Sequence, residues 1–174
     1  MKKIFLQRLV IAITGLILNT YTPAQTALNT RPFNIGDAGT HSTLLADLKA
    51  KNVKSFNHFT NTYPEAILRK IHEEKDGTHI NATLNGNSLK VQYDVKGKFQ
   101  NAVLTYPSDA LNEKIADQVM QSFPGFTVFG TVIDVTVRDQ SALLVMIENR
   151  KSWKRVRITD DGMDVYEEYV KSIQ

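Results

Sequence analysis

Residues 79–95 read HINATLNGNSLKVQYDV, and this stretch decides the fold. Apolar residues occupy every second position on both arms, which is the period of a half-buried β-strand. The two apolar sets are Ile80, Ala82 and Leu84 before the turn and Leu89, Val91, Tyr93 and Val95 after it. Asn85-Gly86 between them is typical of a two-residue hairpin turn, which pairs Ala82 with Leu89 and Ile80 with Val91. The sequence therefore predicts an antiparallel hairpin with one apolar face. The other face is polar and carries His79, Asn81, Thr83, Lys90 and Gln92.

The flanking segments extend this hairpin into a helix followed by four strands. Upstream, apolar residues at helical spacing are Leu44, Leu45, Leu48, Val53, Phe56 and Phe59. We expect Ser42-Thr43 to cap this helix, Asn52 to divide it, and Pro64 to end it. We expect the first strand over residues 66–74, followed by a tight turn at Asp76-Gly77. Downstream, Gly97 takes a left-handed position in a bulged turn before a strand over residues 98–105.

The same order appears a second time. Phe123-Pro124 lies sixty residues after Tyr63-Pro64 and also follows a helical pattern. We expect that helix to start at Ser108 or Asp109. Its apolar stripe is Leu111, Ile115, Val119 and Met120. Four strands follow, over residues 127–138, 142–148, 153–159 and 163–170. The buried row expected for the first of them is Phe129, Thr131, Ile133, Val135 and Val137.

The repeat predicts an α+β fold of two tandem units, each a helix followed by four antiparallel strands. The units span residues 42–106 and 107–174. Their sheets lie side by side or form one continuous sheet, with the helices packed on one face. Residues 25–41 are polar and predict a flexible N-terminal arm.

The first residues have the pattern of an export signal. Lys2, Lys3 and Arg8 accompany the apolar run of residues 9–18, which is too short to span a bilayer comfortably. We expect a signal peptide over residues 1–24, cleaved after Ala24; the alternatives are cleavage after Ala27 and an uncleaved membrane anchor. The chain has 21 basic and 18 acidic residues. Without the three basic residues of the leader the two numbers are equal, so charge gives no support for nucleic-acid binding.

Residues 52–99 resemble the exported PepSY-like proteins of Gram-negative bacteria, whose units share an architecture with the β-lactamase inhibitor protein. The matching positions are Phe56, Phe59, Tyr63, Asp76, Gly77, Asn85, Gly86, Tyr93, Asp94 and Gly97, with Trp153, Asp160 and Gly162 in the second half. The chain departs from the family where its first strand opens, with Ile67-Leu68-Arg69 instead of Val-Lys-Trp. The resemblance implies an exported, non-catalytic module, and some distant relatives inhibit enzymes.

The best candidate binding surface lies on the open face of the second half. If Val156 and Ile158 point to the core, then Trp153, Arg155 and Arg157 point away from it. Tryptophan and arginine are enriched at protein-binding hot spots. Leu144 and Met146 on the neighbouring strand are expected to join them in an apolar patch. The alternative is that Trp153 folds over a sheet edge and the arginines pair with Glu148, Glu167 or Glu168.

A second cluster, formed by His72, Glu74 and His79, is weighed as a metal site on the first hairpin. Its spacing is not the helical HExxH arrangement, and a solvated hairpin face explains it as well. We therefore expect no metal and no cofactor.

The sequence offers no recognised catalytic motif. It has no cysteine, which excludes thiol catalysis, thiolate metal ligands, disulfides and a lipoprotein anchor, and it has no G-x-S-x-G, P-loop or G-x-G-x-x-G motif. We expect a periplasmic or secreted module that is not an enzyme and meets the membrane only through its signal peptide during export. We expect it to bind an envelope protein or peptide, and no nucleic acid. The narrower form of this expectation is an inhibitor of a peptidase or other hydrolase. The alternatives are an enzyme with an unrecognised active site and a structural envelope component.

Overall fold

The computed structural model describes residues 36–171, which lie in one compact unit. The signal peptide and most of the expected arm fall outside the described residues. The helices are α2 (Gly36–Lys51), α3 (Val53–Thr62), the short η1 (Ser108–Ala110) and α4 (Glu113–Ser122). The strands are β1 (Ile67–Glu74), β2 (Gly77–Leu84), β3 (Asn87–Asp94), β4 (Phe99–Pro107), β5 (Thr127–Val128), β6 (Thr131–Val137), β7 (Gln140–Glu148), β8 (Ser152–Thr159) and β9 (Gly162–Val170).

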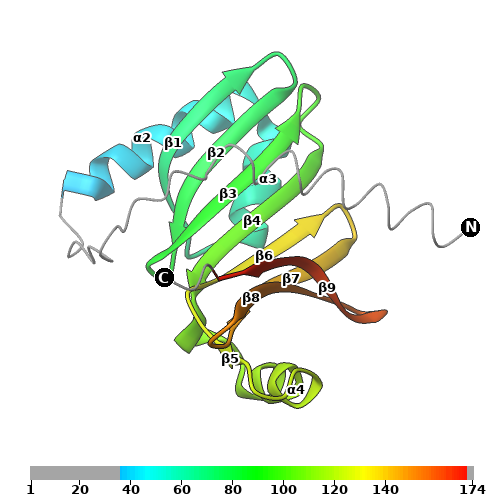
Figure 1. Cartoon of the computed structure of the whole chain (residues 1–174). Helices are drawn as coiled ribbons and strands as arrows, with labels where there is room; N and C mark the ends of the chain where they lie inside the picture. Colours follow the sequence, from blue (N-terminus) through cyan, green and yellow to red (C-terminus); the bar gives the residue numbers. More distant parts are fainter. Residues whose placement is uncertain (1–35, 172–174) are drawn as a thin grey trace, which may run out of the picture. The chain divides into compact units, whose positions relative to one another are not determined.

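All nine strands belong to one antiparallel sheet, which follows the chain from β1 to β9 (Figure 1). Only β5 leaves this path, because it pairs with β7. The central hairpin has the predicted register: Ala82 lies opposite Leu89 and Ile80 opposite Val91. β4 and β6 pair from Asn101 to Pro107, so the two halves form a continuous sheet. The mixed α+β class is confirmed, whereas the tandem organisation stays a prediction.

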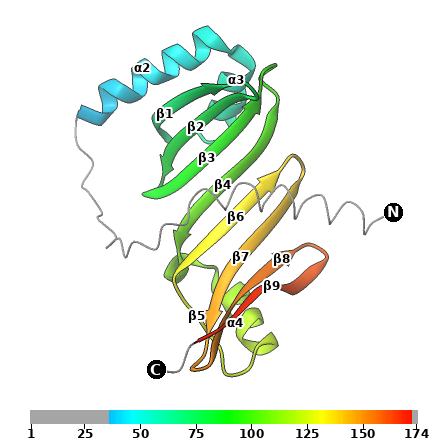
Figure 2. The ribbon, with the colours of Figure 1, turned by 45° about the horizontal axis from the view of Figure 1, so that its top comes forward.

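The three α-helices of residues 36–171 cover one side of the sheet (Figure 2). Leu48 of α2 and Phe59 of α3 share a buried cluster with β1–β4 residues. A second cluster joins Val119 of α4 to β6–β8 residues, including Val132 and Val145. Cross-strand pairing places the sheet residues of both clusters on the same side. The opposite side is called the open face below. None of the described helices is long and apolar enough to cross a membrane.

One residue of β6 lies between the two clusters. Asp134 is directly opposite Leu104 in β4, which packs against the first cluster, and Leu143 in β7, which packs against the second. Burial raises the pKa of its carboxyl group. Burial, with a smaller contribution from this carboxylate, also raises the pKa of Tyr63 and Tyr106. The carboxyl group therefore occupies a low-dielectric junction that favours its neutral form.

The first helical segment begins earlier than the sequence predicted. α2 starts at Gly36, not near Ser42, so residues 36–41 of the expected arm are helical. The backbone N–H of Leu68 donates to His41 Nδ1 at 2.9 Å and ties the start of this helix to β1. The predicted division at Asn52 is confirmed, because Asn52 is the N-cap of α3 and its Oδ1 accepts from the N–H groups of Lys54 and Ser55.

Two expectations for the second half were wrong, and a third holds only in part. Asn112, not Ser108 or Asp109, caps α4, because the intervening residues form η1. The long strand expected over residues 127–138 is broken around Gly130, whose φ is +71°, into β5 and β6. The row containing Ile133 and Val135 faces the open side, where Val135 is buried as expected and Ile133 is partly buried. Val132 faces the helix side, packs in the cluster of Val119 and is fully buried.

Candidate functional site

The open face of β8 and β9 carries a group of arginine and aromatic side chains that we call the arginine–aromatic face. Its members are Trp153, Arg155, Arg157, Tyr166 and Tyr169. Val156 and Ile158 pack into the second cluster, so the three β8 residues of the group point the other way, as predicted. The last hairpin of the chain therefore gathers these side chains on one surface.

Stacked aromatic rings form the accessible end of this face. Trp153 and Tyr169 are opposite one another in the β8–β9 ladder. Their ring centroids are 4.0 Å apart and their planes differ by 18°. Tyr169 is 48% exposed and Trp153 is partly exposed. Stacking across strands fixes both rings, so they offer a preorganised apolar surface.

Two buried arginines lie further along the same strand. The Arg157 side chain donates to both carboxylate oxygens of Asp164, from Nε at 2.9 Å and from Nη2 at 2.8 Å. Its guanidinium carbon also lies 5.8 Å from the ring centroid of Tyr166. Arg155 Nη1 pairs with Glu167 Oε2 at 2.8 Å. These charge-assisted contacts offset part of the cost of burying the two guanidinium groups and link β8 to β9.

The remaining expected members of the patch differ in how far they reach solvent. Leu144 lies opposite Arg157 and Met146 opposite Arg155, so both are on the open face. Leu144 is only 1% exposed, however, and cannot contribute accessible apolar surface, whereas Met146 is partly exposed. Glu148 pairs with Lys171 and Glu168 with Lys154. Of the three glutamates weighed as arginine partners, Glu167 is the one paired with an arginine in the described contacts.

Sequence reasoning missed the β9 side of this surface. In a hairpin with a two-residue turn, residues at equal distances from the turn lie opposite one another. Counting outward from Asp160-Asp161 in this way correctly places Asp164 opposite Arg157. Tyr166 is then the extra residue of a β-bulge, which moves every later pair by one position. Tyr169 therefore lies opposite Trp153, where an unbulged hairpin would place Glu168. No local residue pattern marks this bulge.

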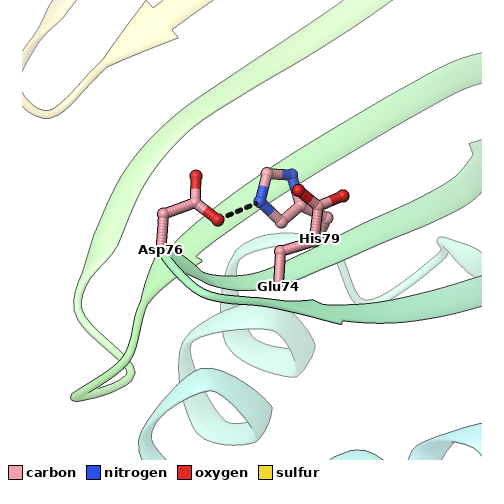
Figure 3. Close-up of side chains that lie close together, drawn as sticks. All are labelled: Glu74, Asp76 and His79. Atoms are coloured by element: carbon pink, nitrogen blue, oxygen red, sulfur yellow. Dashed lines mark hydrogen bonds and ion pairs between the residues drawn. The ribbon is translucent and has the colours of Figure 1, made fainter.

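A second group of polar side chains lies at the turn between β1 and β2, and we call Glu74, Asp76 and His79 the turn cluster (Figure 3). Their nearest potential ligand atoms all lie within 4.8 Å of one another. His79 Nε2 is 3.0 Å from Asp76 Oδ1. The hydrogen bond from His79 is the main cause of the lowered pKa of Asp76. His72 is opposite His79 in the ladder but is not part of this group, and Asp76 takes its place.

Comparison with known proteins shows a similarity in fold but does not assign the chain to a family. The chain matches no family model and no curated protein. Its structure is similar to a BLIP-like protein from Bacteroides fragilis, with a TM-score of 0.51 and 14% identity over 71% of this chain and 88% of that one. Two DUF2874 family proteins have a TM-score of 0.48. The one from Bacteroides uniformis is 14% identical and covers 67% of this chain and 87% of its own, and the one from Bacteroides ovatus is 17% identical and covers 67% and 85%. Because the sequence identity is low, the similarity to the BLIP-like protein concerns the fold alone.

Proposed function

We propose that this chain is an exported, non-catalytic module that binds a protein or peptide of the cell envelope through the arginine–aromatic face. The observation that carries the proposal is the stacked pair of Trp153 and Tyr169, which is partly exposed on the open face of the β8–β9 hairpin. Large rings with few rotatable bonds give contact area at low entropic cost, and they are the usual anchors of protein interfaces.

The charges around the rings support a protein partner better than a polyanion. Arg155 pairs with Glu167 and Arg157 with Asp164. Both arginines of this face thus have an acidic neighbour, so the face presents no concentrated positive field of the kind that binds nucleic acid. The expected contact is a buried aromatic centre with a mixed polar rim.

Export is the second part of the proposal, and it depends on the leader pattern of residues 1–24. The measurement is the intact mass of the protein recovered from the periplasm or culture medium. We expect the mass of a chain that begins at Gln25. Recovery of the uncleaved chain with the membrane fraction would instead indicate an anchor.

Inhibition of a peptidase or other hydrolase is the narrower form of this function. It is supported by the fold similarity to a BLIP-like protein and by the resemblance of residues 52–99 to PepSY-like units, whose architecture is shared with the β-lactamase inhibitor protein. Its test is a steady-state assay of any hydrolase recovered as a partner, with the purified chain added in increasing amounts. A hydrolase that binds and keeps its full rate would exclude the inhibitor form and retain the binding module.

Site-directed crosslinking tests the binding surface. A photo-crosslinking residue replaces Tyr169 in one variant and Lys90 in the other. Lys90 is the control because it is an exposed residue in the polar half of the same face. We expect a discrete crosslinked partner from position 169, and a purified partner to bind Trp153→Ala about thirtyfold more weakly, as expected for a hot spot worth about 2 kcal/mol. Equal recovery from both positions, or unchanged affinity with a folded Trp153→Ala, would refute the assignment.

A further inference from the structure

We propose that the turn cluster is a binding site for a divalent transition-metal ion of the zinc type, held by Glu74, Asp76 and His79. This site is independent of the arginine–aromatic face, because its three residues lie at the β1–β2 turn of the first half. It also differs from the arrangement expected from the sequence, in which His72 was the third ligand.

The positions of the ligand atoms are close to those that an ion requires. Around a tetrahedral ion with bonds of 2.0–2.2 Å, neighbouring ligand atoms are about 3.3–3.6 Å apart. His79 Nε2 and Asp76 Oδ1 are 3.0 Å apart, and one potential ligand atom from each of the three residues lies within 4.8 Å of the other two. The ion would take the place of the hydrogen between Nε2 and Oδ1. Glu74 is exposed, and its carboxylate must turn toward this pair to complete the set (Figure 3).

Side chains outside the cluster orient the Asp76 carboxylate. Gln92 Nε2 donates to Asp76 Oδ2 at 2.9 Å, and Gln92 Oε1 accepts from Asn101 Nδ2 at 2.8 Å. This chain of hydrogen bonds begins on β4, crosses β3 and ends at the turn, so it leaves Asp76 Oδ1 directed at His79. Hydrogen-bond partners of this kind hold a ligand carboxylate in place before an ion arrives.

The backbone under the cluster is also fixed. Gly77 ends the turn with a φ of +141°, and a Cβ there would clash with the carbonyl oxygen of Tyr93, only 1.9 Å away. β1 and β2 pair from this point, with Glu74 opposite Gly77 and Glu73 opposite Thr78. The ligands therefore come from a closely packed hairpin end, on which their relative positions are set by strand pairing.

The ligand types select the class of ion. An imidazole favours zinc, copper, nickel or iron over calcium and magnesium, which prefer an all-oxygen set. Two carboxylates and one imidazole leave a net charge of −2 when His79 is neutral, which matches a divalent cation. Three protein ligands also leave a fourth position open for water or for a donor atom of a bound molecule.

The other histidines of the described chain have different surroundings. His41 Nδ1 accepts from the Leu68 amide, and His58 Nδ1 lies 3.0 Å from the Tyr93 hydroxyl. His72 lies opposite His79 on the same face but outside the cluster. With four histidines in the chain, a binding signal must be assigned by substitution.

Calorimetric titration of the purified protein with zinc chloride tests the proposal. We expect one zinc ion per chain, no detectable binding by His79→Gln, and affinity about tenfold lower in Gln92→Leu, which removes the hydrogen bond to Asp76. Glu74→Gln should weaken binding, whereas Glu73→Gln, its neighbour on the opposite face of β1, should bind as the wild type does. Circular dichroism shows whether each variant is folded.

Several results would overturn the site. These are the absence of binding heat with wild-type protein, unchanged affinity in His79→Gln, or equal losses in Glu74→Gln and Glu73→Gln. Loss of binding in a folded His72→Gln would move the ion to the His72–His79 pair and refute the assignment of the turn cluster. Because the arginine–aromatic face is untouched by these variants, crosslinking at position 169 is expected to be the same in all of them.

Discussion

Substitution of Gly97 should break a helix cap that lies far away in the sequence. Gly97 has a φ of +74°, and a Cβ at this position would lie 2.1 Å from Asn52 Oδ1. That oxygen accepts from the N–H groups of Lys54 and Ser55 at 3.1 Å each and so caps α3. The Asn52 side chain can avoid a new methyl group only by leaving the helix end.

The cost of Gly97→Ala therefore has two parts. The left-handed backbone costs an alanine about 1 kcal/mol, and loss of an asparagine cap costs about 1 kcal/mol more. Gly86→Ala is the matched control, because Gly86 has a φ of +81° but no atom lies within 4 Å of the place that its new methyl group would take. It should cost about 1 kcal/mol from backbone strain alone. Asn52→Ala should also cost about 1 kcal/mol, from the cap alone.

Urea unfolding of the four variants, including the double variant Asn52→Ala/Gly97→Ala, measures these terms. We expect the double variant to lose about 2 kcal/mol, the same as Gly97→Ala, because the cap can be lost only once. The coupling between the two sites is then about 1 kcal/mol. The reasoning is refuted if Gly97→Ala costs no more than Gly86→Ala, or if the costs at positions 52 and 97 simply add.

Three further predictions concern charged groups. Asp164→Asn should destabilise the protein by about 2 kcal/mol, because it weakens the paired hydrogen bonds to the buried Arg157. Glu168→Gln on the same strand should cost less than about 1 kcal/mol, because its ion pair is more exposed. Equal losses in urea unfolding would contradict this. Burial raises the pKa of Asp134, so the folded state holds its proton more tightly and stability falls as pH rises above the unfolded value of 3.8. Asp134→Asn should remove that part of the pH dependence and raise the melting temperature at pH 7, and an unchanged or lower melting temperature would count against it. Burial lowers the pKa of His58, so the unfolded state gains its proton first and stability falls as pH drops below 6.5. His58→Gln should show a smaller fall as the pH is lowered from 6.5, and an identical profile would exclude His58 as the cause.

The parts of the fold that the sequence predicted are those encoded by local signals. Alternation and the Asn85-Gly86 turn define the β2–β3 register without any distant contact. Asn52 divides the first helical segment because its side chain supplies the cap itself. The place of Met163 to Val170 in the repeat predicts a strand, and this segment forms most of β9.

The errors have non-local causes. Residues 131–137 are mostly β-branched, so either face of β6 could have been buried from pattern alone. The packing of α4 against the sheet buries Val132 on the helix side. The start of α2 is supported by the bond between Leu68 and His41, whose residues are 27 positions apart. Leu144 is buried on a face that pattern reasoning treated as solvated, which periodicity cannot reveal.

The candidate sites also combine features that follow from local sequence with features that depend on distant contacts. The side of β8 that carries Trp153, Arg155 and Arg157 follows from alternation, whereas their partners on β9 depend on the bulge at Tyr166. Glu74 and His79 share a hairpin face in both sequence and structure. Asp76 enters their cluster because its carboxylate is held by Gln92, sixteen residues away, which no spacing rule includes.

The order of strands in the sheet has a consequence for how the chain folds. Apart from β5, each strand pairs with the strand that precedes or follows it, and the one long excursion is the η1–α4 segment between β4 and β6. Most pairings therefore close short loops, which gives a low contact order for a sheet of this size. The β4–β6 pairing spans the longest connection between neighbouring strands, because η1 and α4 lie between them, so it carries the largest loop-closure cost and joins the two parts of the sheet.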